Sequence, residues 1–229
     1  MAAVHVVREI RRYPVKSMAG ESLEAVEVDA RGLAGDRWYA VVDGDGKLAS
    51  GKHSTRFRRR DAVFEHAART TPDGVRVSGR GGDWAVGDAA LDAALSDAMG
   101  DPVRVLAEAA TPHQDQGEVS LVGTASLDWC REHLGVDADR RRIRPNLVVD
   151  TSEPFVEETW TGLVTVGTAR LRFDQRIVRC RMIDIAQEGL PPEGGWLKAL
   201  TDTRDLSLGI HLDVVEPGTI RFGDEVRLG

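Results

Sequence analysis

The stretch Ala169-Arg170-Leu171-Arg172-Phe173 alternates apolar and basic side chains one for one. Side chains of a β-strand point alternately to its two faces, so Leu171 and Phe173 share one face and the two arginines share the other. The pattern predicts a strand that is buried on one side. A second strand is predicted close behind it, over Ile177–Ile185.

Short strand candidates recur along the rest of the chain, and predicted helices are few. Glycine is abundant, at 24 residues, which is typical of short strands separated by turns. Further strands are predicted over Val4–Ile10, Trp38–Val42, Val103–Leu106, Leu147–Val149 and Ile220–Leu228. Helices are predicted over Ala89–Met99, from Thr124 or Ser126 to Leu134, and over Trp196–Leu200. These patterns indicate a mainly β fold with a few helices (α+β), built as one or two barrel-like units.

The length of the chain, 229 residues, suffices for one large domain or two small ones. The acidic, proline-flanked stretch Glu108–Glu118 is the best candidate for a boundary. We therefore expect two domains, over residues 1–107 and 108–229.

Composition excludes several functional classes. The net charge of −7 and the pI of 5.4 argue against a general binder of nucleic acids or anionic membranes. No run of about 18 apolar residues is present, so we expect no membrane-spanning helix. Met1–Arg8 lacks the features of a signal peptide, and two cysteines are too few for a disulfide framework. A cytoplasmic location is therefore expected.

Cys180 is the most informative single residue, because it lies between two basic residues in Arg179-Cys180-Arg181. The period of a strand places Val178, Cys180 and Met182 on one face and the arginines on the other. Nearby guanidinium charge favours the thiolate, which binds metals or attacks electrophiles. From this spacing alone, a small buried hydrophobe in a barrel strand is the commoner outcome.

The other cysteine, Cys130, shares a predicted helix face with Leu127 and Leu134 and is expected to pack in the core. Neither cysteine has a second Cys or His at the spacing of a structural zinc site. The sequence therefore argues against zinc.

Lys16-Ser17 and Gly35-Asp36-Arg37 could together hold a phosphate, since a lysine, a hydroxyl and a guanidinium are good phosphate ligands. Asp36 could instead neutralise Arg37 in a structural pair. Two basic runs, Lys52–Arg60 and Arg140–Arg144, could bind an anion or lie in solvent and balance nearby acids. In a chain of net charge −7, a small anionic ligand is favoured over a nucleic acid.

Other acidic residues allow further interpretations. His113 and Asp115 could complete a thiol triad with Cys180, in which the histidine is the base and the aspartate orients it. The sequence does not show that these three residues meet. Glu157 and Glu158 are adjacent on an extended segment and would face opposite ways, so we interpret them as ordinary surface charge.

Seven segments, taken in order, resemble the MOSC family, the proteins related to the molybdenum cofactor sulfurase C-terminal domain. Tyr13–Gly20 and Gly32–Trp38 are similar to the family's N-terminal β-barrel domain. The segments that resemble the MOSC domain itself are Val119–Leu127, Arg142-Ile143-Arg144-Pro145-Asn146 with Leu147–Val149, Phe155–Trp160, Arg179-Cys180 and Pro217–Asp224. The resemblance extends over nearly the whole chain. It implies a MOSC N-terminal β-barrel domain followed by a MOSC β-barrel domain.

The resemblance also implies a pterin-bound molybdenum cofactor (Mo-molybdopterin). Cys180 matches the cysteine whose thiolate ligates molybdenum in the family's reductases, in agreement with the preference of soft ligands. Asp115 matches an acid near the metal, with a role in water or proton handling. The positions that match cofactor contacts are Lys16, Ser17 and Arg37, at the phosphate, with Arg144 and Asn146.

The implied activity is reduction of N-hydroxylated or N-oxygenated small molecules, with Cys180 and Asp115 as catalytic residues. Two cysteines cannot hold an iron–sulfur cluster, so electrons would come from a separate protein that carries a flavin, haem or iron–sulfur centre. The alternatives are a non-catalytic cofactor carrier or sulfur-handling protein, and a cofactor-free thiol enzyme or binding module. The chain departs from the family pattern at two places, near the implied metal and the implied substrate pocket. Val178 stands where relatives often carry a small polar residue, and Arg181–Gln187 lacks their Thr-Thr-x-Asp-Pro run.

Overall fold

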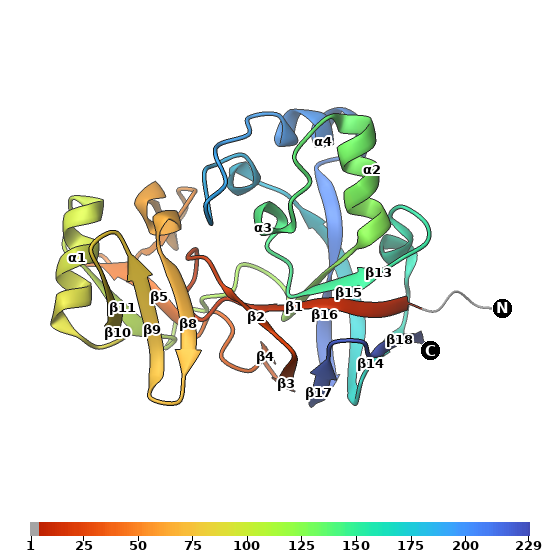
Figure 1. Ribbon diagram of the computed structural model, residues 1–229, viewed down its shortest axis with the longest axis horizontal. Helices are drawn as coiled ribbons and strands as arrows, with labels where there is room; N and C mark the ends of the chain where they lie inside the picture. Colours follow the sequence, from red (N-terminus) through yellow and green to blue (C-terminus); the bar gives the residue numbers. More distant parts are fainter. Residues whose placement is uncertain (1–4) are drawn as a thin grey trace.

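A computed structural model describes residues 5–229 of the chain (Figure 1). Its largest element is a closed β-barrel in the strand order β13-β12-β16-β15-β14-β18-β1, in which β1 pairs again with β13. The short strand β2 (Glu21–Leu23) extends the sheet beside β1. The barrel strands are β1 (His5–Arg12), β12 (Val119–Gly123), β13 (Leu147–Asp150), β14 (Leu163–Val166), β15 (Ala169–Val178), β16 (Ser207–Glu216) and β18 (Glu225–Leu228).

The barrel interior confirms the alternation read from Ala169–Phe173. Ala169 and Leu171 are fully buried and Phe173 packs against the same core, whereas Arg170 and Arg172 point outward. A strand whose apolar residues recur at every second position can bury one whole face. The mainly β fold expected from the sequence is therefore confirmed.

A smaller lobe lies beside the barrel and contains its own apolar core (Figure 1). Its sheets have the strand orders β11-β5-β6-β7 and β10-β9-β8. The strands are β5 (Tyr39–Asp43), β6 (Leu48–Ser50), β7 (Phe57–Arg59), β8 (Ala67–Thr71), β9 (Gly74–Gly79), β10 (Gly82–Ala85) and β11 (Val103–Ala107). Helix α1 (Ala89–Met99) inserts Leu91 and Leu95 into this core and ends, as predicted, at Met99; the next residue, Gly100, adopts a left-handed φ of 66°.

The other helices lie against the barrel around a third apolar cluster centred on the fully buried Trp196. They are α2 (Thr124–Leu134), α3 (Arg140–Ile143) and α4 (Trp196–Arg204). Cys130 of α2 is completely buried in this cluster, as its helical spacing predicted. None of the helices within residues 5–229 is long and apolar enough to cross a bilayer.

Strands pair across the boundary expected at residue 108. β1 pairs with β13 and β18, and β3 (Ala25–Asp29) pairs with β17 (Gly218–Arg221) and β4 (Gly32–Leu33). The segment 108–118 joins β11 to β12 and contains neither helix nor strand. The division into residues 1–107 and 108–229 stays a prediction about domains, and the barrel itself takes strands from both sides of it.

The strand predicted over Ile177–Ile185 is wrong beyond Val178. β15 ends there, and Arg181–Ile183 forms a 3₁₀ turn that follows Cys180. In this turn the Ile183 amide donates to the Cys180 carbonyl instead of to a neighbouring strand, and the Arg181 guanidinium binds Asp61 of the smaller lobe. The first predicted strand begins in the structure at His5, and Val4 lies outside the described residues.

Glu157 corrects a second interpretation, because it is fully buried rather than surface charge. Its carboxyl accepts hydrogen bonds from the Gly123 amide, at 2.9 Å, and from the Ser126 hydroxyl, at 2.7 Å. Both donors lie at the start of α2, where unpaired amides favour a carboxyl partner. Burial nevertheless raises the pKa of Glu157. Its neighbour Glu158 pairs with Arg176 and Arg204.

We expect Glu157→Ala to lower the free energy of unfolding by about 2–3 kcal/mol, because it leaves buried donors at Gly123 and Ser126 without an acceptor. Urea denaturation measures the change. Glu153→Ala, at an exposed position close by, is the control and should stay within about 0.5 kcal/mol of wild type. Equal losses in the two variants would contradict a capping role for Glu157.

Candidate functional site

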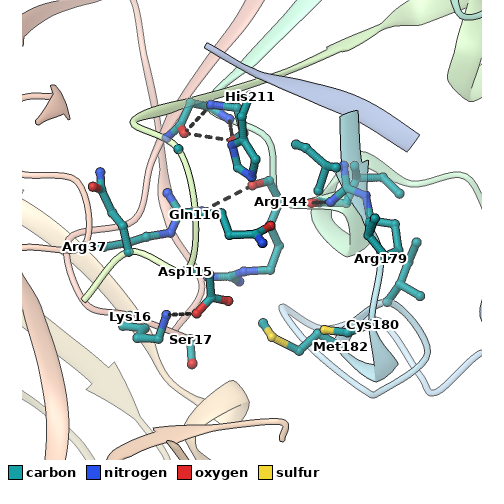
Figure 2. Close-up of a pocket in the computed structure, with 18 of the residues that line it drawn as sticks. Lys16, Ser17, Arg37, Asp115, Gln116, Arg144, Arg179, Cys180, Met182 and His211 are labelled. Carbon is teal, nitrogen blue, oxygen red and sulfur yellow. Dashed lines mark hydrogen bonds and ion pairs between the residues drawn. The ribbon is translucent and has the colours of Figure 1, made fainter. Parts of the chain in front are cut away.

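A pocket of about 390 Å³ is lined by residues of both the barrel and the smaller lobe. Ser120 of β12, Ile177 of β15 and His211 of β16 come from the barrel, and Lys52, between β6 and β7, comes from the smaller lobe. The seven residues singled out from the sequence all lie on its wall, and Figure 2 labels six of them. They are Lys16, Ser17, Arg37, Asp115, Arg144, Asn146 and Cys180.

Basic side chains dominate this wall, although the chain as a whole has a net charge of −7. Asp115 and Glu118 are the acids that line it. The cations that line it are Lys16, Arg37, Lys52, Arg142, Arg144 and Arg179. A concave, poorly solvated wall of one charge sign concentrates ions of the opposite sign. The pocket is therefore suited to an anionic ligand.

Lys16 and Asp115 form the central ion pair of the pocket (Figure 2), with 2.8 Å between Nζ and Oδ1. Burial lowers the pKa of Lys16 to about 8, and the nearby carboxylate limits the fall. Burial alone would raise the pKa of Asp115, but the ammonium groups of Lys16 and Lys52 outweigh it and hold that pKa well below its usual range. Asp115 is therefore ionised throughout the neutral range.

Arg37 both lines the pocket and forms the structural pair with Asp36 that the sequence left open. Its guanidinium lies over the fully buried Tyr13 ring, 4.8 Å from the centroid, and that of Arg144 lies 4.3 Å from the same centroid. The Tyr13 amide donates to Asp36 at 2.8 Å. One aromatic ring and one carboxylate thus fix two pocket arginines.

Arg144 is buried and Arg179 is half-buried, and neither has a carboxylate within 4.0 Å among residues 5–229. Nη2 of Arg144 donates to the Met18 carbonyl at 2.7 Å, but its buried Nη1 has no partner among the described residues. Burial lowers the pKa of Arg144, and it lowers that of Arg179 to about 10. A buried guanidinium with a free donor gains from an incoming anion.

Three of the predicted ligand contacts have a left-handed backbone, which side chains other than glycine seldom adopt. The φ angles are 69° at Ser17, 50° at Arg37 and 55° at Arg144. Such a conformation costs about 1–3 kcal/mol and persists only where surrounding contacts impose it. Of the seven non-glycine residues with positive φ in the described chain, these three line the pocket, where surrounding contacts hold them in place.

Cys180 is partly exposed on the pocket wall, directly after β15 (Figure 2). Because the strand ends before it, Arg179 does not point to the opposite face as the period-two pattern predicted; it lines the same pocket. His113 is not on the wall, and its amide donates to Glu108 at 2.6 Å. Asp115 binds lysine instead, so the thiol triad is not formed.

Asn146 is largely committed to the framework. Its side-chain oxygen accepts from the amide and the hydroxyl of Ser120, at 3.1 and 2.8 Å, and its side-chain nitrogen donates to the Arg11 carbonyl. These bonds connect the β13 region with β12 and β1. One amide hydrogen of Asn146 is left for a ligand.

The two basic runs are divided between structure and pocket. Arg58 and Arg60 pair with Asp43, and Arg59 pairs with Asp61. In the second run, Arg140 pairs with Glu9 and Arg141 with Asp139. Lys52, Arg142 and Arg144 are the members that line the pocket. Most of each run therefore balances acids.

Sequence reasoning missed His211 and did not recognise Arg179 as part of the wall. His211 lies on β16, and burial, with help from Arg179 and Arg37, lowers its pKa to about 4. It is therefore a neutral imidazole in a cationic pocket. A lone histidine in an apolar strand carries no local pattern that distinguishes it from a core residue.

Within residues 5–229, no group of three or more His, Cys, Asp or Glu side chains is placed to hold a metal ion.

The fold and the site define a class of protein: a β-barrel protein with a cationic pocket that contains an accessible thiol. The chain belongs to the MOSC family. The MOSC domain matches residues 109–227, and the MOSC N-terminal beta barrel domain matches residues 4–137.

Two curated relatives and one solved structure resemble the chain. "Molybdenum cofactor sulfurase 2" of Aedes aegypti is 26% identical over 93% of this chain, and "Molybdenum cofactor sulfurase" of Danio rerio is 31% identical over 31% of it. The matches cover only 31% and 9% of those proteins, so the chain corresponds to a third of their length or less. The YuaD protein of Bacillus subtilis shares the fold, with a TM-score of 0.50 and 13% identity over 98% of this chain and 94% of that chain.

We expect a thiol reagent such as iodoacetamide to label Cys180 and spare Cys130 in the folded protein. Cys180 is accessible, whereas Cys130 is fully buried and burial raises its pKa to about 12. Mass spectrometry of peptides locates the label, and denatured protein, in which both should react, is the control. Labelling of Cys130 at the same rate would contradict the burial.

We expect Lys16 to make folding stability rise between about pH 8 and about pH 10. Its pKa is about 8 when folded and near 10.5 when unfolded, so in this window the unfolded chain binds more protons, and unfolding becomes less favourable as the pH rises. Urea denaturation should show wild type gaining about 2 kcal/mol relative to Lys16→Met across the window. Parallel pH curves for the two proteins would contradict the shift.

Proposed function

We propose that the pocket binds the molybdenum cofactor and that the protein is an oxidoreductase, which reduces N-hydroxylated or N-oxygenated small molecules. The observation that carries the proposal is the placement of two uncompensated guanidinium groups, Arg144 and Arg179, on one wall with the accessible thiol of Cys180. An anionic organic group with a thiolate-seeking metal satisfies both features. The family membership and the names of the relatives support the same ligand.

The residues present fit such a group. Arg144, whose buried Nη1 has no partner among the described residues, lines a cavity with room for a ligand of cofactor size, at about 390 Å³. Lys16, Ser17 and Arg37 would hold the phosphate. Arg144 and the free amide hydrogen of Asn146 would contact the rest of the cofactor.

When bound, the cofactor supplies two-electron redox chemistry at molybdenum. The chain's own part is to bind and orient the cofactor and to exclude competing ligands. The Cys180 thiolate would tie the metal, and the buried cations would neutralise the anionic cofactor. We assign Asp115 to water or proton handling, in which it acts as an ionised hydrogen-bond acceptor, since Lys16 and Lys52 keep its pKa low.

Electron supply is proposed to come from a separate protein with a flavin, haem or iron–sulfur centre. The chain has two cysteines, whereas an iron–sulfur cluster usually takes four. One of the two is buried in the helical cluster, so we place the electron donor in a separate protein. The other partner is the small-molecule substrate. We propose the reducing cytoplasm as the setting.

A carrier or sulfur-handling role is the second candidate, favoured by the curated relatives that are named molybdenum cofactor sulfurases. It uses the same pocket residues. The two candidates differ in one property: a reductase turns over with an electron donor, and a carrier binds the cofactor without turnover.

We expect wild-type protein from a host that makes the cofactor to contain near-stoichiometric molybdenum and pterin. Cys180→Ala should lose at least about 90% of the metal and of the donor-driven reduction of an amidoxime, because it removes the thiolate ligand. Elemental analysis, pterin fluorescence after oxidation and a reductase assay measure the three quantities.

Cys130→Ala is the matched control, since it removes the other cysteine from the core and should keep metal and activity. Metal and pterin without turnover would favour the carrier. Absence of both from wild type, in a host shown to load a control enzyme, would reject cofactor binding.

A further inference from the structure

Asp115 lies at the centre of a cluster of cations on the pocket wall. Its carboxylate is 2.8 Å from Nζ of Lys16, 3.3 Å from Nζ of Lys52 and 3.9 Å from Nη2 of Arg56. The same three cations lie over the Phe57 ring, each 4.7–4.8 Å from its centroid. One carboxylate thus forms ion pairs with three positively charged side chains.

Lys16 has little free surface for a second anion. Its side chain is only 5% exposed, Phe57 covers it, and Asp115 is its hydrogen-bond partner among the described residues. An anion that binds the Lys16 ammonium must replace the Asp115 carboxylate or share the ammonium with it. Sharing brings two negative charges together, which is unfavourable in a poorly solvated site.

Asp115 is the partner that can move. It belongs to the segment 108–118, which contains neither helix nor strand, and its side chain is 36% exposed. Lys16 is held from two sides, because its amide donates to the Tyr39 carbonyl at 2.8 Å and its stem is buried. Displacement of Asp115 breaks ion pairs but no strand pairing.

We propose that the Asp115 carboxylate is an internal counter-ion that occupies the position of a ligand's anionic group, so that a phosphate-like anion binds Lys16 by displacing Asp115. The inference rests on the proposed function in that the same pocket receives the anion. In the absence of that anion, Asp115 reduces the repulsion among Lys16, Lys52 and Arg56. The ion pairs of Asp115 therefore stabilise the ligand-free pocket and lower its affinity for the anion.

The test uses sulfate as a phosphate-like probe with the full chain, by isothermal titration calorimetry at about pH 6.5, where Lys16 stays protonated. Asp115→Asn removes the competing charge and should bind sulfate about tenfold more tightly than wild type. Asp115→Ala should change affinity in the same direction, which guards against a variant that folds poorly. Circular dichroism checks the fold of each variant.

Glu118→Gln is the matched control. Glu118 also lines the pocket, but its carboxylate accepts from the Val214 amide and does not pair with Lys16. Loss of its charge should alter sulfate affinity less than about threefold. In a Lys16→Met background, Asp115→Asn should also gain less than about threefold, because the shared ammonium is gone.

If Asp115→Asn binds sulfate with the same affinity as wild type, or more weakly, the counter-ion role is overturned and the proposed function stays intact. Sulfate binding to none of the variants would reject the anion pocket, and the proposed function with it. Binding to Asp115→Asn alone would support the inference in its strongest form.

Discussion

The burial of positive charge beside Tyr13 is the constraint on which the pocket depends. Arg144 and Arg37 lie over the Tyr13 ring, and no carboxylate neutralises Arg144 or Arg179 within the described chain. Charge held out of water is costly unless carbonyl oxygens and aromatic faces surround it. Carbonyl groups of Met18, Ile143 and Leu208 fill that role. The guanidinium donor that these carbonyl groups leave without a partner, Nη1 of Arg144, is available to a ligand.

The same constraint explains why the pocket needs both parts of the chain. Lys16 and Ser17 follow the barrel strand β1, Lys52 belongs to the smaller lobe, and Cys180 follows β15. Within the barrel, Asn146 joins β12 and β1 through bonds to Ser120 and to the Arg11 carbonyl. The barrel side of the wall is thus held by hydrogen bonds between strands, whereas Asp115 approaches from a segment without regular structure.

Local sequence patterns correctly predicted the structural features that depend on residues close together in the chain. Alternation predicted the buried face of Leu171, and Gly100 marked the end of α1. The predicted continuation of a strand to Ile185 is wrong, because a 3₁₀ turn follows Cys180 and Arg181 binds Asp61, which is 120 positions away in the sequence. Glu157 was misread for the same reason, since its partners lie more than 30 positions away. The site residues found from the family resemblance share one cavity, whereas His211 had no pattern of its own to mark it.

Closure of the barrel has a consequence for how the protein is made. His5 of β1 pairs with Val226 of β18, so the first described strand leaves the ribosome long before its partner exists. Contacts between residues so distant in sequence form slowly, and an unpaired strand edge is prone to aggregation in the meantime. β2 and β13 can pair with β1 earlier, but the barrel closes only after translation has passed Val226.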